Sequence, residues 1–275
     1  MNTKKSRFIG LLLCGSKNPY TSMAVVDFYE GESRLFLVES LEGVKHKNIH
    51  TRDKDSDEEL IEKIKNLDDG SDLTIITSAP LTYPACFNCK NENCDGISVC
   101  NNIEVKYILK TYDQLKKQKK NLRKFTPYTQ RAVEVWLRTE FADIEAPHEA
   151  LGGSMSAITA RIQYIKKRLN KYTFLESYSK ASLWSFLKIL DLPEFYLKDY
   201  KDIIDGKRYR ERFLEKLEKE NHIFIYNADY EKLVKNYILF DAFILALTGY
   251  WDKIGKSRKL PPEISQEKSF IVPKI

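Results

Sequence analysis

The chain has no apolar run of the length that crosses a membrane, which takes about 20 consecutive residues. Its first apolar stretch, residues 8–14, is too short for a secretory signal and leads into a second strand-like segment. These absences predict a cytoplasmic protein with no membrane partner. In a reducing compartment, clustered cysteines favour metal binding over disulfides.

Glycine and proline are scarce in the 275 residues, at 11 and 9, and the glycines form neither a P-loop nor a dinucleotide-binding pattern. Histidine is rarer still, and none of the four residues pairs visibly with a nucleophile. A Ser-His or Cys-His catalytic arrangement is therefore not indicated. The formal net charge of +6 is mild, but its distribution along the chain is uneven.

Cysteine is also infrequent, yet four of the five residues are crowded together as C-x2-C-x4-C-x5-C: Cys86, Cys89, Cys94 and Cys100. Asn, Gly and Asp turn formers separate them, so four thiolates could close a tetrahedral site around one metal ion. The pattern favours structural Zn²⁺. An iron–sulfur cluster, which uses the same ligand set, is the second choice, and a loop of free thiols stays open.

A basic stretch follows the cysteine loop, and its candidate nucleic-acid contacts are Lys116, Lys117, Lys119, Lys120 and Arg123. Its simpler interpretation is the solvated face of a helix. Two further candidates are Arg131 and Arg161, because arginine can bind phosphate oxygens with two donors. The alternative for these arginines is ion pairing along helices, with Glu134 and Glu145 as partners.

The hydrophobic pattern predicts strands at residues 8–14, 22–29, 34–40 and 72–78, with a helix at 57–67 before the last of them. The fourth strand is expected to join the first in parallel. Helices are then expected near 106–123 and at 132–141, 157–169, 181–190, 209–220 and 239–251, with a strand at 172–178. We expect one α/β domain over residues 1–256, with an insertion at about 86–170, and a peripheral C-terminal tail at 257–275.

Several different short motifs follow one another along the chain in a particular order. They lie at residues 78–81, 130–134, 151–153, 158–169, 175–178, 200–201, 208–217 and 240–243. In this order they resemble the domain-of-unknown-function 429 family, which is described as predicted nucleases. The resemblance implies a ribonuclease H-like mixed sheet, with three antiparallel strands followed by parallel strands and flanking helices. It also implies phosphodiester hydrolysis with Mg²⁺ or Mn²⁺ held by carboxylates.

Two acids stand where the resemblance implies catalytic residues: Glu176 at a strand end and Asp241 in an apolar helix. Leu13 and Ser78 stand where the family has acids, and Asp27 is a partial substitute only if it lies nearby. The expectation is therefore a nuclease fold with an eroded acidic site and weak or lost hydrolysis. The alternative is a non-catalytic module that binds nucleic acid or protein through the cysteine loop and the basic stretch.

Overall fold

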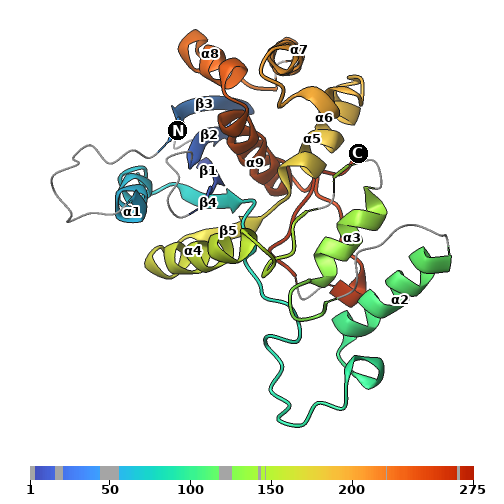
Figure 1. Ribbon diagram of the computed structural model, residues 1–275. Coiled ribbons are helices and arrows are strands. Elements are labelled where there is room, and N and C mark those ends of the chain that lie inside the picture. The colour runs from blue at the N-terminus through green and yellow to red at the C-terminus, as the bar shows by residue number, and fades with distance from the viewer. Residues whose placement is uncertain are drawn as a thin grey trace.

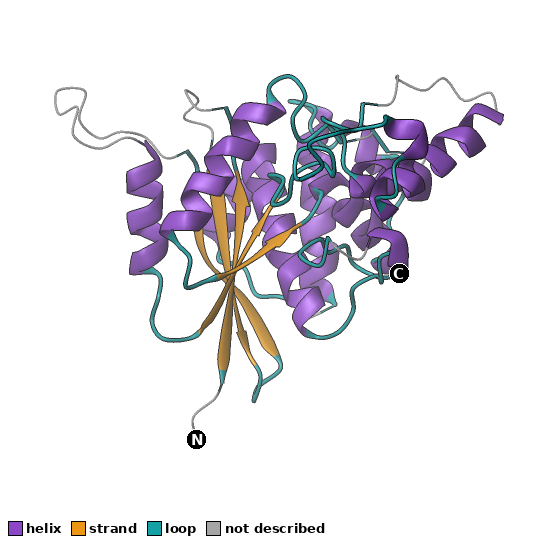
Figure 2. Ribbon diagram, turned by 90° about the horizontal axis from the view of Figure 1, so that it is seen from below, coloured by secondary structure: helices purple, strands orange, loops and turns teal. Residues whose placement is uncertain are grey.

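Five strands form one mixed sheet in the order β3-β2-β1-β4-β5 in the computed structural model (Figures 1 and 2). The strands are β1 (Lys5–Leu12), β2 (Ser22–Tyr29), β3 (Arg34–Leu41), β4 (Asp72–Thr77) and β5 (Thr173–Glu176). β2 pairs antiparallel with both β1 and β3, whereas β4 pairs parallel with β1 and β5. The expected α/β class and the parallel joining of the fourth strand to the first are confirmed.

The structure describes residues 4–15, 21–43, 56–117, 126–141, 144–145, 147–220, 222–264 and 267–275. Within them lie α1 (Ser56–Asn66), α2 (Ile103–Lys117), α3 (Ala132–Glu140), α4 (Met155–Arg168) and α5 (Ser179–Ile189). These are followed by α6 (Tyr196–Asp199), α7 (Asp205–Lys219), α8 (Asn227–Lys235) and α9 (Tyr237–Lys253). Short 3-10 turns at Ile97–Val99 and Pro262–Ile264 complete the described elements.

Alternation along the central strands divides the core into two layers. Phe8 of β1 and Val26 of β2 belong to the larger apolar cluster, which includes most of α9 and the buried face of α5. Ile9 and Val25, one residue along each strand, belong to the second cluster with α1 and α4. Successive strand side chains point to opposite faces, so this sheet is covered on both sides, as Figure 2 shows.

α9 packs against β1 closely enough that one strand position must be glycine. A Cβ built on Gly10 would lie 1.8 Å from the backbone oxygen of Ala242 and 2.6 Å from the backbone nitrogen of Ala246. These neighbours are backbone atoms, which cannot rotate away. The close approach fixes the height of α9, and of its buried Asp241, above the sheet.

The C-terminal segment differs from the expected peripheral tail, because three of its residues, Phe270, Ile271 and Val272, are buried. It runs beside the end of β5, where the Glu176 N–H donates to Ser269 and the Ile271 N–H donates to Glu176. The predicted insertion is likewise part of the core, since α3 belongs to one apolar cluster and α4 to the other. Two helices were not expected, the four-residue α6 and the charged α8.

Among the described residues, no single helix is both long enough and apolar enough to span a membrane. Of the helices in the described ranges, only α8 and α9 taken together reach that length and composition, and the chain bends by 115° between them. In this structure α9 is instead the buried central helix, with apolar side chains packed nearly all round it.

Gly10→Ala is expected to lower the free energy of unfolding by about 3 kcal/mol or more, because the methyl group collides with the α9 backbone. The matched control is Gly15→Ala, where an added Cβ has no neighbour within 4 Å and φ is not positive. Urea denaturation of both variants measures the difference. Equal stability of the two variants would contradict the close approach of α9 to β1.

Candidate functional site

A pocket of about 310 Å³ opens at the carboxyl ends of the parallel strands; we call it the strand-end pocket. Its lining includes Leu13, just after β1, Ser78, just after β4, and Glu176, the last residue of β5. Asp241 from α9 lines the same pocket. The four positions that the resemblance implies for a catalytic site therefore lie around one cavity, although they come from four separate segments.

The carboxylate of Asp241 is buried and already holds two in-chain partners. The Tyr200 hydroxyl donates to its Oδ1 at 2.8 Å, and the Lys201 ammonium lies 3.0 Å from its Oδ2. Burial, reinforced by the nearby Asp241 charge, raises the pKa of the Tyr200 phenol well above its ordinary value, so it stays a donor. A lysine charge thus lies at the acid where a divalent ion is expected.

Glu176 is neutralised in the same way, by a guanidinium. Arg131 donates from Nη1 to Oε2 at 2.8 Å and from Nη2 to Oε1 at 2.6 Å. The backbone N–H of Leu81 also donates to Oε2, at 2.7 Å. Both oxygens of this carboxylate are therefore engaged by donors of the protein itself.

Arg131 joins several segments through what we call the Arg131 cluster: Arg131, Glu134, Glu176 and Glu267. Its Nε donates to Glu134 at 2.9 Å, and its Nη1 lies 3.7 Å from Glu267. Burial raises the pKa of Glu267 to about 7 against the opposing effect of Arg131, and burial likewise raises the pKa of Glu134. Only 3% of Arg131 is exposed. This geometry favours the ion-pairing alternative over the predicted phosphate contact.

Arg161 is likewise buried, with 7% of its surface exposed, and its guanidinium donates hydrogen bonds within the protein. It donates to Asp57 at 2.7 Å, to the backbone oxygen of Cys14 at 2.6 Å and to Thr21 at 3.0 Å. It thereby ties α4 to α1 and to the end of the first strand, in place of the predicted phosphate contact. Asp27 pairs with Arg7 at 2.6 Å through both oxygens and is not among the residues that line the strand-end pocket.

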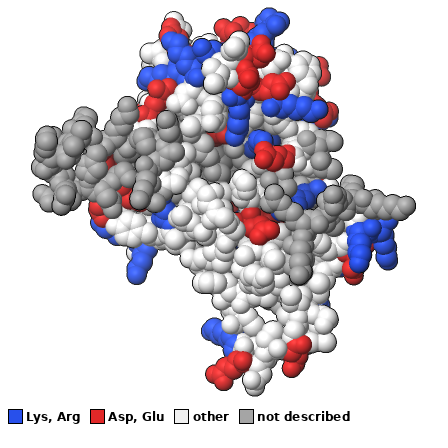
Figure 3. Space-filling model, viewed as in Figure 1, with Lys and Arg blue, Asp and Glu red and all other residues white. Residues whose placement is uncertain are grey.

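Lys116 and Lys117 are exposed in the last turn of α2, where Figure 3 shows Lys and Arg at the free end of this helix. Lys119, Lys120 and Arg123 lie outside the described residues. The described half of the basic stretch is thus accessible, and its role in nucleic-acid binding stays a prediction.

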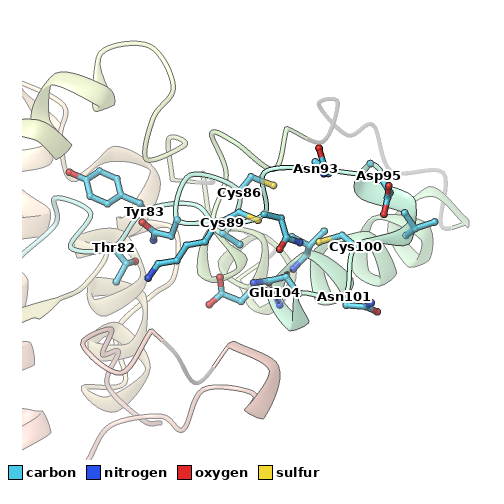
Figure 4. Close-up of a pocket in the computed structure, with 18 of the residues that line it drawn as sticks. Thr82, Tyr83, Cys86, Cys89, Asn93, Asp95, Cys100, Asn101 and Glu104 are labelled. Atoms are coloured by element: carbon cyan, nitrogen blue, oxygen red, sulfur yellow. Dashed lines mark hydrogen bonds between the residues drawn. The ribbon is translucent and has the colours of Figure 1, made fainter.

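The cysteine loop surrounds a second cavity, of about 720 Å³, which we call the cysteine pocket. Cys86, Cys89, Cys94 and Cys100 all line it, and Figure 4 shows three of them around the same space. Burial and, after it, the neighbouring cysteines raise the pKa of Cys86. In the described part of the chain, no three His, Cys, Asp or Glu side chains are arranged to hold a metal ion. The donor set suits Zn²⁺, but metal binding requires the thiols to approach one another.

Sequence reasoning missed three residues that matter here. Lys201 lies within a matched motif, and only its position beside Tyr200 could have marked it. Glu104 and Glu267, which line the cysteine pocket, carried no signal. Glu267 in particular lies in the C-terminal segment, which was expected to be a peripheral tail.

Comparisons with known protein families, with curated proteins and with solved structures find no match to this chain. The resemblance described above therefore stays a prediction.

Replacing Glu267 with Gln tests the buried cluster through pH. The wild-type pKa is raised, so its stabilising contribution is complete below the ordinary value of 4.5 and is lost as pH rises to about 7. The unfolding free energy of wild type minus that of Glu267→Gln should therefore fall by about 2 kcal/mol between pH 5 and pH 7.

Urea denaturation at several pH values measures this difference. The exposed loop residue Glu92 provides the control, and Glu92→Gln should follow wild type across the range. A constant gap between wild type and Glu267→Gln would show that Glu267 does not titrate in this window.

Proposed function

We propose that this chain is a ribonuclease H-like protein that binds nucleic acid at its strand-end pocket and basic surface, with metal-dependent hydrolysis lost. The observation that carries the proposal is the neutralisation of both remaining acids by cations of the chain. Glu176 is bound by Arg131, and Asp241 lies 3.0 Å from the ammonium of Lys201.

The sheet supports the ribonuclease H-like assignment. Three strands run antiparallel in sequence and two parallel strands follow, in the order that the resemblance implies. The positions implied for catalytic acids meet at one edge of this sheet. Neither the order of strands nor this convergence follows from composition, so each is independent support for the fold.

Electrostatics argue against a two-metal reaction. Hard ions such as Mg²⁺ need several carboxylate oxygens, and two of the four expected positions are Leu13 and Ser78. The third acid that lines the pocket and is buried, Glu134, accepts from Arg131 and from the Ala150 N–H. A metal ion would have to displace arginine and lysine charges that are already in place.

Phosphate recognition fits the charges that remain accessible. Lys180 and Lys201 line the strand-end pocket and are partly exposed; Lys180 pairs with Glu145 and Lys201 with Asp241, so a phosphate group would share these cations with the two acids. Lys116 and Lys117 add exposed charge at the end of α2. Lysines of this kind bind backbone phosphates without reading sequence, which is the chemistry expected of a binding module.

The first test is cleavage of labelled single- and double-stranded DNA and RNA with Mn²⁺, comparing wild type with Asp241→Asn. We expect no cleavage that depends on Asp241, because Lys201 already neutralises this carboxylate. Cleavage by wild type that disappears in Asp241→Asn would contradict the proposal and establish metal-dependent hydrolysis as the function.

Binding is tested with the double variant Lys116→Glu, Lys117→Glu by fluorescence anisotropy over a range of salt concentrations. Affinity should fall, and the slope of log affinity against log salt should flatten by up to about 2, since each phosphate contact contributes about 0.9. The control, Lys63→Glu with Lys65→Glu, changes two lysines in the last turn of α1, far from α2 in Figure 1. Equal losses in the two double variants would indicate non-specific attraction only.

We further propose that the cysteine loop binds structural Zn²⁺ through its four thiolates. Purified wild type should then contain about one zinc per chain, and Cys89→Ser should lose it and be less stable. Cys14→Ser, which changes a cysteine outside the loop, should retain it. Elemental analysis measures the zinc content, and thermal unfolding measures the stability of each variant. A brown protein that contains iron would instead support an iron–sulfur cluster.

A further inference from the structure

The inner wall of the cysteine pocket carries two buried carboxylates, Glu267 of the Arg131 cluster and Glu104, which lies outside that cluster. Glu104, in the first turn of α2, and Glu267, from the C-terminal segment, line this pocket together with the hydroxyl-bearing Thr82. Figure 4 shows Glu104 on the helix side of the cavity, with its carboxylate on the side toward Thr82. Thr82 donates to Glu267, so the two acids and this hydroxyl belong to one polar wall.

Glu104 is only 7% exposed, yet its carboxylate has no hydrogen bond or ion pair with any described residue. Its contacts at the helix start are made by its backbone N–H, which donates to Asn102. Burial raises the pKa of Glu104, and the more distant charge of Arg131 opposes this only in part. In the described part of the chain, the Glu104 oxygens are not among the buried side-chain atoms that lack a partner; they open onto the cavity, where a cationic partner from outside the chain has access to them.

The neighbouring charges do not supply that partner. Arg131 is the single guanidinium among Glu134, Glu176 and Glu267, and Glu104 adds a fourth acid within its electrostatic range. Four carboxylates around one cation leave negative charge uncompensated unless protons or another cation neutralise it. A cation arriving from the cysteine pocket would compensate the two acids on that side.

The rest of the lining contains two charged residues of opposite sign, Lys90 and Asp95, and is otherwise made of uncharged side chains and the four cysteines. Five asparagines line the cavity: Asn88, Asn91, Asn93, Asn101 and Asn102. Lys90 is the only basic residue among the lining residues; it is exposed and forms no ion pair with Glu104 or Glu267 within the described structure. The volume of about 720 Å³ is far larger than a bare ion needs and falls within the usual range for small organic ligands.

We propose that the cysteine pocket binds a small organic cation, whose ammonium or guanidinium group lies between Glu104 and Glu267 while the asparagine amides contact the rest of the molecule. A metal ion fits this wall less well, because only two carboxylates and one hydroxyl face the cavity there. The site shares the cysteine pocket with the four thiols but lies on the wall formed by Thr82, Glu104 and Glu267, and the proposal does not depend on nucleic-acid binding.

Isothermal titration calorimetry of the full chain with spermidine and with agmatine tests the proposal, since these probes carry ammonium and guanidinium groups. Wild type should bind at least one of them, and Glu104→Gln should weaken that binding by about tenfold or more, as expected for a lost charge-assisted hydrogen bond. Glu92→Gln, which changes an acid of the same loop outside the lining, should alter affinity by less than about twofold.

Proton release provides a second readout. Glu267 is close to half protonated at pH 7 and must ionise to receive the cation, so binding should release up to about half a proton. The measured enthalpy should therefore change with the ionisation enthalpy of the buffer. Glu104→Asp keeps the charge but shortens the side chain, so its affinity for the probe should lie between those of wild type and Glu104→Gln. This variant provides the comparison if Glu104→Gln folds poorly.

Three results would overturn the proposal. The first is that neither probe binds at millimolar concentration. The second is that Glu104→Gln, shown by circular dichroism to be folded, binds the probes as well as wild type does. The third is binding of Mg²⁺ or Mn²⁺, weakened by Glu104→Gln, with no binding of either organic probe, which would make this a metal site.

Discussion

The ion pair between Arg131 and Glu176 is the contact on which the surrounding structure depends. Arg131 is the N-cap residue of α3, and Glu176 is the last residue of β5. The pair therefore fixes where the helix starts relative to the sheet. The same carboxylate accepts from Leu81, and the same guanidinium donates to Thr82, which anchors the chain just before the cysteine loop. Because the pair is buried, breaking either side would leave a charge without water or a partner, a loss of about 3–5 kcal/mol for such pairs.

This pair also limits the chemistry of the strand-end pocket. A carboxylate that ligates a metal ion needs a free oxygen, and Glu176 has committed both of its oxygens to in-chain donors. Asp241 is committed to Tyr200 and Lys201 in the same way. The acids of this pocket are therefore paired with cations of the chain, and Glu176 has no free oxygen left to hold a metal ion or to activate water.

Much of the fold could be predicted from local pattern. Short apolar segments placed β1 to β4 close to their observed bounds, and a longer, nearly continuous apolar run did the same for α9, which is buried nearly all round. α8 escaped notice because it buries only one residue, Leu233, and so has little apolar pattern. The C-terminal segment was misjudged because its burial depends on pairing with Glu176, nearly a hundred residues earlier. Glu134 was named as a possible partner of Arg131 because it lies three residues away, whereas Glu176 and the Asp57 partner of Arg161 were hidden, since long-range ion pairs leave no local signal.

The two pockets lie on either side of one guanidinium, and this arrangement links their charges. Glu176 and Glu134 line the strand-end pocket, while Glu267 and Glu104 line the cysteine pocket. Burial, and after it the neighbouring charge of Glu176, raises the pKa of Glu267 to about 7, although the charge of Arg131 opposes this. Any cation that reaches Glu267 lets it ionise and adds negative charge beside Arg131, which then interacts with Glu176 in a changed field. If the proposed cation binds beside Glu267, its charge acts on Arg131 and, through Arg131, on Glu176 in the strand-end pocket.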